Sequence, residues 1–187
     1  MPMAVEVTRR RFTADEYQEM GRAGILREGD RVELIDGDVL AMSPIGSPHN
    51  GTLNRLNRLF SQRAGDTAIV QVGAIRLDSY SEPQPDLVLL KARADFYMSA
   101  LPAPSDVLLA IEVAQSSLAY DRNVKAALYA RRGIAEYWIV DLNGGEVIRH
   151  TDAVDGRYSR VAAVPHDHEF APGLLPGCVV TTRDLLG

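Results

Sequence analysis

The chain has 187 residues, 46% of them hydrophobic and 24% charged, with a formal net charge of −5. This length and composition predict one soluble globular domain, 1–187, with a substantial core. The single cysteine, Cys178, excludes an internal disulfide and fits a reducing compartment. No apolar run approaches the ~20 residues of a membrane span, and no apolar segment follows the arginines at 9–11 as in a signal peptide. We therefore expect a cytoplasmic protein with no membrane partner.

A short helix is the first predicted element. Thr13 and Glu16 have the spacing of a capping box, which marks a helix start. A β-hairpin follows over residues 31–42, because Asp36-Gly37 separates two apolar strands. Glu33 lies on the strand face opposite its two apolar neighbours, so alternation alone makes it an outward-facing residue.

The next helix is predicted to start at Ser47-Pro48, with serine as the N-cap and proline at the first helical position. His49 lies in its first turn. It is either a surface histidine or, near an acidic site, a contact for a phosphate or a metal-bound water. Two strands are predicted after this helix, over 68–72 and 74–77. In the helix that starts at Ser47-Pro48, the residues expected on the face that packs against the core are Leu53, Leu56, Asn57 and Phe60.

Two apolar runs, 87–90 and 107–114, read as strands of the core. Asp86 opens the first run and Glu112 lies near the end of the second. An ionised carboxylate in an apolar interior needs a cation, a metal or hydrogen-bond donors. Glu112 therefore either ion-pairs structurally or belongs to a functional site. The proline-rich loop at 101–105 is expected to lie close to that site.

A helix is predicted from Asp121 to Arg132, with Val124 and Leu128 on its packed face. Lys125 falls at the edge of that face, from which it can reach the sheet near Glu112; an i,i+4 pair with Asp121 is the simpler role. Strands at 137–141, 146–151 and 157–164 follow, with a hairpin turn at 143–145. The alternating residues from His166 to Glu169 could bind a metal ion. A solvated loop is the favoured interpretation, because no nearby residues complete a set of metal ligands.

These motifs together carry a family resemblance. Pro85-Asp86 followed by Glu112-Val113-Ala114 resembles the PD-(D/E)XK nuclease signature, whose last position is normally lysine and is alanine here. The wider pattern resembles the Uma2 family (DUF820) of restriction-endonuclease-like proteins, in which the following helix supplies the missing lysine, here Lys125. The segments that carry this resemblance are 33–38, 43–49, 84–86, 112–113 and 129–141.

The resemblance implies an α/β fold of the restriction-endonuclease-like type, a mixed β-sheet flanked by helices with additional antiparallel hairpins. It also implies a metal-dependent endonuclease that hydrolyses DNA phosphodiester bonds with Mg²⁺ or Mn²⁺. Asp86 and Glu112 would hold the metal, with the Val113 carbonyl as a third ligand. Lys125 would orient the attacking water and offset negative charge on the phosphate, remaining protonated beside two carboxylates. Glu33 and His49 would be accessory residues of the same site.

DNA is the expected partner, and a homodimer would suit a substrate with two strands. The net charge of −5 weighs against nucleic-acid binding, and the basic clusters at 55–63 and 122–132 are also compatible with solvated helix faces. Three alternatives stay open. They are a degenerate family member that binds without cutting, suggested by Ala114; a structural protein with a Glu112–Lys125 salt bridge; and a hydrolase of smaller phosphoesters.

Overall fold

The computed structural model describes residues 9–27 and 29–187, so the first eight residues of the predicted domain lie outside the described ones. The fold is α/β, as predicted: a mixed sheet in the order β3-β4-β5-β6-β7-β8, with β5 and β6 parallel and the other neighbours antiparallel. Its strands are β3 (Ala68–Gln71), β4 (Leu87–Lys91), β5 (Val107–Ala114), β6 (Tyr137–Asp141), β7 (Glu146–Val154) and β8 (Arg157–Val164).

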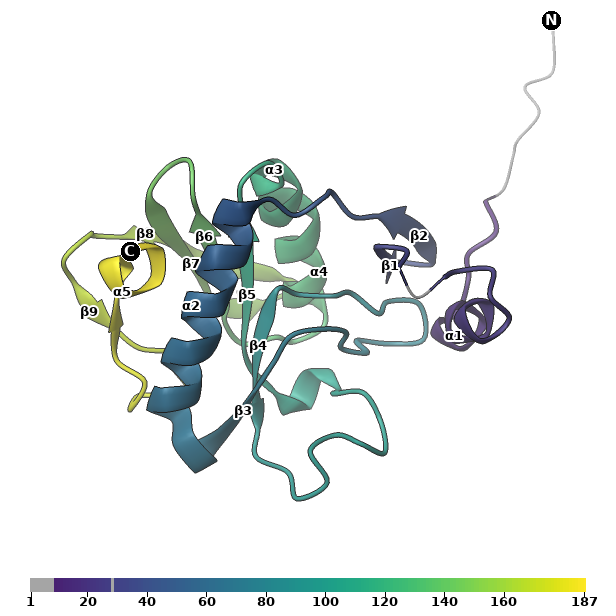
Figure 1. Ribbon diagram of the computed structural model, residues 1–187, viewed down its shortest axis with the longest axis horizontal. Coiled ribbons are helices and arrows are strands. Elements are labelled where there is room, and N and C mark those ends of the chain that lie inside the picture. Colours follow the sequence, from purple (N-terminus) through teal and green to yellow (C-terminus); the bar gives the residue numbers. More distant parts are fainter. Residues whose placement is uncertain (1–8, 28) are drawn as a thin grey trace, which may run out of the picture.

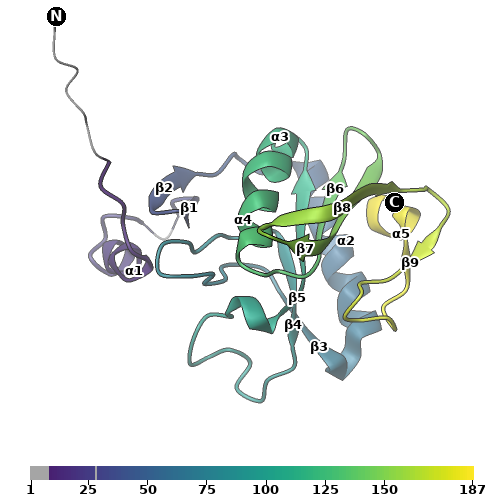
Figure 2. The ribbon, with the colours of Figure 1, turned by 180° about the vertical axis from the view of Figure 1, so that it is seen from behind.

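Helices cover both faces of this sheet. The long helix α2 crosses one face (Figure 1), and α3 and α4 lie on the opposite face (Figure 2). The α-helices are α1 (Ala14–Arg22), α2 (Ser47–Ala64), α3 (Leu118–Tyr120), α4 (Ala126–Arg131) and α5 (Thr182–Leu186). Shorter turns are the 3₁₀ turns η1 (Gly65–Thr67) and η2 (Pro104–Asp106) and the π-helical turn η3 (Asp121–Lys125). Two small antiparallel sheets pair β1 (Val32–Ile35) with β2 (Asp38–Ala41), and β9 (Glu169–Phe170) with β10 (Val180–Thr181).

Strand β5 forms the centre of the core, and every one of its residues is buried. Leu109, Ile111 and Val113 pack in the cluster that includes α2, whereas Ala110 and Ala114 pack in the cluster that includes α4. The fully apolar run at 107–114 is therefore explained by helices on both faces, as expected for a central strand. Glu112 is the charged side chain in this run, on the α4 side.

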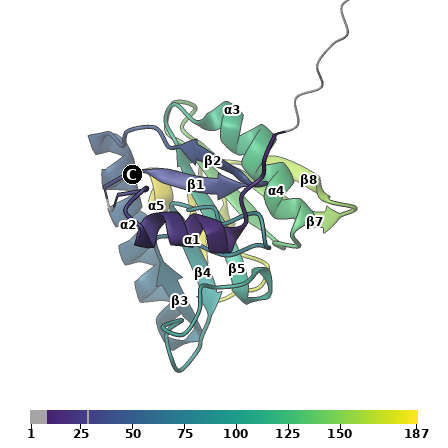
Figure 3. The same cartoon turned by 90° about the vertical axis from the view of Figure 1, so that its right-hand side faces the viewer.

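The N-terminal capping box and hairpin are confirmed. The Glu16 backbone N–H donates to Thr13 Oγ1 (3.2 Å), and the Thr13 backbone N–H donates to the Glu16 carboxylate (2.9 Å). In the β1–β2 turn, Asp36 (φ 48°) and Gly37 (φ 86°) are both left-handed, as a tight two-residue hairpin requires. Figure 3 shows α1 lying alongside this hairpin. The two pack together through a small apolar cluster of Ala14, Tyr17 and Leu34.

The helix predicted at 121–132 starts earlier, at Leu118, and contains the π-helical turn η3. A π-helical turn inserts one extra residue and so rotates the helix face that follows it. Val124, predicted to pack inward, is consequently 37% exposed, whereas Lys125 is only 2% exposed. Asp121 is also buried. The turn therefore places Asp121 and Lys125 on the inner face of this helix, whereas Arg122 and Arg131 remain exposed.

Several local predictions are wrong. Gly46 is the N-cap of α2 in place of Ser47, whose backbone is already helical, and Asn57 is exposed. Residues 74–77 form no strand: their alternation buries Ile75 and Leu77, but their backbone N–H groups bond to Ser81, Pro83 and Pro102 instead of to a neighbouring strand.

The proline-rich loop at 101–105 does not lie close to the predicted site. It connects the ends of β4 and β5 that are farthest from Asp86 and Glu112, because the two strands are antiparallel. Figure 1 shows this loop at the lower end of the sheet, with α3 and the start of α2 at the upper end. Among the described residues, none of the helices has both the length and the hydropathy of a membrane span.

Candidate active site

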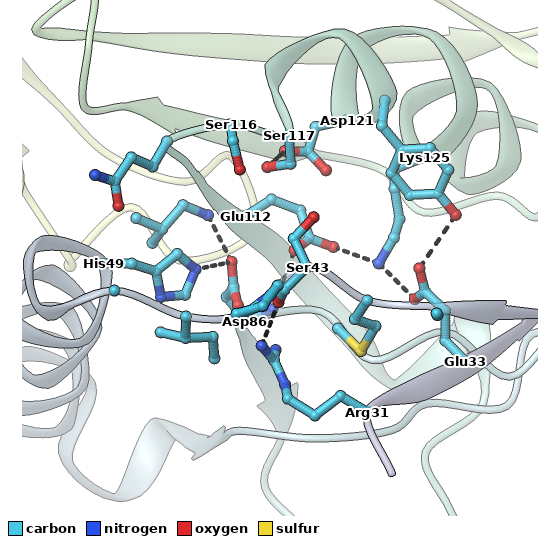
Figure 4. Close-up of a pocket in the computed structure, with 18 of the residues that line it drawn as sticks. Arg31, Glu33, Ser43, His49, Asp86, Glu112, Ser116, Ser117, Asp121 and Lys125 are labelled. Atoms are coloured by element: carbon cyan, nitrogen blue, oxygen red, sulfur yellow. Dashed lines mark hydrogen bonds and ion pairs between the residues drawn. The ribbon is translucent and has the colours of Figure 1, made fainter.

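One cavity of about 440 Å³ lies where β5 ends, between the β1–β2 hairpin, the start of α2 and the η3 turn. All the residues predicted for the site line it, and Figure 4 shows the side chains of Glu33, His49, Asp86, Glu112 and Lys125 directed toward one another. The predicted residues are Glu33, His49, Asp86, Glu112, Val113 and Lys125. Residues that are distant in the sequence therefore meet in one place.

Antiparallel pairing brings the two core acids together. Leu87 of β4 pairs with Ile111 of β5, so Asp86 and Glu112 are neighbours at the same end of the sheet. The Asp86 backbone N–H donates to Glu112 Oε2 (3.3 Å), and the Val113 backbone N–H donates to Asp86 Oδ2 (2.8 Å). Each carboxylate is thus fixed by the backbone of the other strand.

Lys125 lies between two buried carboxylates. Its Nζ is 2.7 Å from Glu33 Oε2 and 3.0 Å from Glu112 Oε1. Burial lowers the pKa of the Lys125 ammonium, but the Glu112 and Glu33 carboxylates outweigh burial and raise that pKa above its ordinary value. Lys125 is therefore a charged group, as predicted for a lysine beside two acids. The alternative i,i+4 partner, Asp121, instead accepts a hydrogen bond from Ser117 Oγ (2.6 Å).

His49 is buried, not a surface residue. Its Nε2 lies 3.0 Å from Asp86 Oδ2, the same oxygen that accepts the Val113 N–H. The position of His49 in the first turn of α2 directs its ring at Asp86, immediately before the start of β4 (Figure 4). Similarly, Glu33 is buried because the face of β1 opposite Leu34 is covered by the helix that carries Lys125.

Negative charge exceeds positive charge at this site. Four acidic side chains line the cavity, against two cations, the Lys125 ammonium, which pairs with Glu33 and Glu112, and the Arg31 guanidinium; the acids are Glu33, Asp86, Glu112 and Asp121. Burial raises the pKa of the Glu112 carboxyl, the Lys125 ammonium opposes this effect, and the Asp86 carboxylate adds to it. Burial likewise raises the pKa of Asp121 to about 6, although the hydrogen bond from Ser117 opposes the shift.

The donor set fits a hard divalent cation such as Mg²⁺ or Mn²⁺. Among residues 9–27 and 29–187, no three His, Cys, Asp or Glu side chains form a complete ligand cage. Mg²⁺ commonly uses one or two carboxylates, with water and substrate phosphate completing its shell. Asp86 and Glu112 supply such a pair beside an open cavity, and the surplus negative charge favours a cation there. His166, Asp167 and His168 form an exposed turn, and Glu169, also exposed, begins strand β9.

Two tyrosines and an arginine at the site were not predicted as functional. Tyr129 Oη donates to Glu112 Oε1 (3.0 Å), and Tyr120 Oη donates to Glu33 Oε1 (3.1 Å). Arg31, immediately before β1, also lines the cavity. The i,i+4 spacing of Lys125 and Tyr129 is the sequence signal that could have placed Tyr129 beside the lysine. Tyr120 and Arg31 carry no such signal.

Comparison with known proteins gives a family and a fold. The Uma2 family model, described as "Putative restriction endonuclease", matches residues 14–183. A solved structure described as a putative nuclease belonging to DUF820 from Anabaena variabilis ATCC 29413 superposes with a TM-score of 0.73 at 13% identity. The superposition covers 94% of this chain and 97% of that chain, which shows a shared fold. None of the curated proteins matches the chain. The chain belongs to the Uma2 family.

Proposed function

We propose that this protein is a DNA endonuclease that hydrolyses phosphodiester bonds with Mg²⁺ or Mn²⁺. The observation that supports the proposal most is the meeting of Asp86, Glu112 and Lys125 at one open cavity, from two strands and a helix. Membership of a family described as putative restriction endonucleases points to the same chemistry.

Asp86 and Glu112 are the proposed metal ligands, with the Val113 carbonyl as a third. A bound divalent ion would supply positive charge at the phosphate and would activate a water molecule for attack. The backbone N–H groups of Asp86 and Val113 hold the two carboxylates in place before any ligand arrives. His49 fixes the Asp86 oxygen that it contacts, so its proposed role is to orient that carboxylate.

Lys125 is proposed to place a fixed positive charge beside the scissile phosphate. A raised pKa makes it a poor base and a lasting source of charge, which suits electrostatic stabilisation of a developing anion. Glu33 holds the ammonium from the side opposite Glu112. Its proposed role is therefore to position Lys125, a more specific role than that of a general accessory acid.

A binding protein without catalysis is the second candidate. Lys125 already forms ion pairs with Glu33 and Glu112, and alanine occupies position 114, where the nuclease signature has lysine. A closed salt-bridge network of this kind also fits a structural role for these residues. A homodimer would suit either a cutting or a binding protein that acts on duplex DNA.

The deciding experiment is a cleavage assay on plasmid and single-stranded DNA with Mg²⁺, Mn²⁺ or EDTA. Asp86→Ala and Lys125→Ala are each expected to lower the rate by at least about a hundredfold, in line with the loss of an electrostatic catalytic group. The matched controls are Asp66→Ala and Lys91→Ala, exposed residues away from the cavity. Cleavage that survives both site substitutions would refute the assigned roles, and wild-type protein that never cuts would favour the binding protein.

A further inference from the structure

Arg31 is a cation at the cavity that the proposed chemistry has not used. We propose that its guanidinium group binds a phosphate of the substrate, and so fixes the nucleic-acid strand opposite the Asp86–Glu112 pair. This inference rests on the proposed function, because it assigns a substrate contact to the same cavity. The argument depends on the charges of the cavity and on what holds Arg31 in place.

The cavity needs a positive charge directed at its ligand. A phosphodiester is an anion, and the carboxylates of Glu33, Asp86 and Glu112 repel it. Lys125 is 2% exposed and its ammonium lies between two of these carboxylates, so much of its charge is already balanced. A metal ion would neutralise Asp86 and Glu112 and, with Lys125, would act at the scissile phosphate, but neither would hold the neighbouring phosphates of the strand. A second cation at the cavity wall meets that need.

Arg31 occupies the required position. It immediately precedes β1 and lines the cavity, and Figure 4 shows its side chain extending toward the Asp86 end of the site. Its Nη1 donates to the Ser43 carbonyl oxygen (2.5 Å), and its own carbonyl oxygen accepts the Met42 backbone N–H (2.8 Å). Within the part of the chain that the structure describes, no carboxylate lies within ion-pair distance of it. The guanidinium is thus oriented by a neutral carbonyl and keeps its charge.

Guanidinium chemistry suits phosphate. Arginine remains protonated, and its planar fork of N–H donors matches two phosphate oxygens at once. The bond to Ser43 uses one nitrogen of Arg31 and leaves other N–H groups for a ligand. The same bond holds the 42–46 segment, which forms the rim of the cavity beside His49. A strand bound here would therefore pass between that rim and the acidic pair.

The test is binding of a short fluorescein-labelled single-stranded oligodeoxynucleotide, followed by fluorescence anisotropy in EDTA, where no metal-dependent cleavage occurs. Arg31→Ala is expected to weaken binding by about tenfold or more, as loss of a charge-assisted contact predicts. It should also reduce the slope of log K against log salt by ~0.7, the value for one lost phosphate contact on a single strand. Arg31→Lys should restore the slope but only part of the affinity, because lysine keeps the charge without the fork.

Arg27→Ala is the matched control, since it removes an exposed arginine four positions away that does not line the cavity. It should change neither the affinity nor the slope. A purely structural role would make Arg31→Ala lower the unfolding temperature while the slope stays unchanged, and that result overturns the proposal. So does a wild-type protein that binds no oligonucleotide. If the wild type shows a salt dependence that Arg31→Ala reduces and yet never cuts DNA, the phosphate contact stands and the nuclease proposal fails. If the wild type cuts DNA and Arg31→Ala binds the oligonucleotide normally, the nuclease proposal stands and the phosphate contact is refuted.

Discussion

Replacing Lys125 with methionine, Lys125→Met, tests the buried charge network directly. The Lys125 side chain is 3% exposed, and its two partners, Glu33 and Glu112, are 4% and 6% exposed. Methionine fills a similar volume but leaves two buried carboxylates without their cation. Breaking a buried ion pair by removing one partner costs about 3–5 kcal/mol. The remaining donors to the two acids, chiefly the hydroxyls of Tyr120 and Tyr129, place the expected loss near the lower end, at about 3 kcal/mol.

Urea unfolding in EDTA provides the measurement. Trp138 is the one tryptophan of the chain and is fully buried, so its fluorescence reports loss of the core. For a chain of this length, a loss of about 3 kcal/mol corresponds to a fall in Tm of roughly 6–12 °C. Lys91→Met, at the exposed end of β4, is the control and should change stability by less than about 0.5 kcal/mol.

A double-mutant cycle sharpens the same prediction. Lys125→Met leaves the Glu33 and Glu112 carboxylates buried without a cation, and adding Glu33→Gln removes one of these two charges. The double variant should therefore lose less free energy of unfolding than the sum of the losses in the two single variants. A Lys125→Met variant that loses under about 1 kcal/mol would refute this reasoning, because that is the range of an exposed pair.

Three further predictions concern the other acids and their donors. Asp121 has a folded-state pKa raised from 3.8 to about 6. The protonated carboxyl therefore adds stability that is fully present below pH ~4 and is lost as the pH rises through 6, by up to ~3 kcal/mol. Asp121→Asn should flatten this part of the pH–stability curve measured by urea unfolding in EDTA; an unchanged curve would contradict the shift. Tyr129→Phe removes a buried donor to Glu112 and should cost about 1.5–3 kcal/mol in thermal or urea unfolding, whereas Tyr80→Phe, on an exposed residue, should be neutral. Asp86→Asn should leave metal-free stability unchanged or higher, because it relieves repulsion of Glu112; a loss above about 2 kcal/mol would instead support a structural role for Asp86.

The sheet and its central strand could be predicted from the sequence because their signals are local. The run at 107–114 is apolar on both faces, and the structure buries all of it as β5. The Asp36-Gly37 turn and the Thr13–Glu16 cap likewise depend on neighbouring residues. By contrast, residues 74–77 show strand-like alternation but find their hydrogen-bond partners in loops, which no local pattern reveals.

The sequence was sufficient to predict which residues form the site, but not how deeply those residues are buried. Alternation correctly placed Glu33 opposite Leu34, but only the tertiary structure shows that the helix carrying Lys125 covers that second face. His49 appeared to be a surface residue because its partner, Asp86, is 37 positions away. The η3 turn changed the phase of the helix by one residue, so uniform helical geometry misplaced Val124 and underestimated the burial of Lys125.

The position of the 101–105 loop could have been inferred. Asp86 opens its strand and Glu112 lies near the end of the next one, so an antiparallel pair that brings them together must place its connection at the far end. Chain topology, applied to the two acids, would have removed that loop from the predicted site.

The most direct test of a divalent-metal site is calorimetric titration of Mn²⁺ into the wild-type protein, Asp86→Asn and the exposed control Asp66→Asn. The proposed site predicts one Mn²⁺ bound per chain by the wild type and by Asp66→Asn, with affinity lowered at least about a hundredfold in Asp86→Asn. Absence of Mn²⁺ binding by the wild type, or equal binding by Asp86→Asn, would contradict the proposal that Asp86 and Glu112 hold a metal ion.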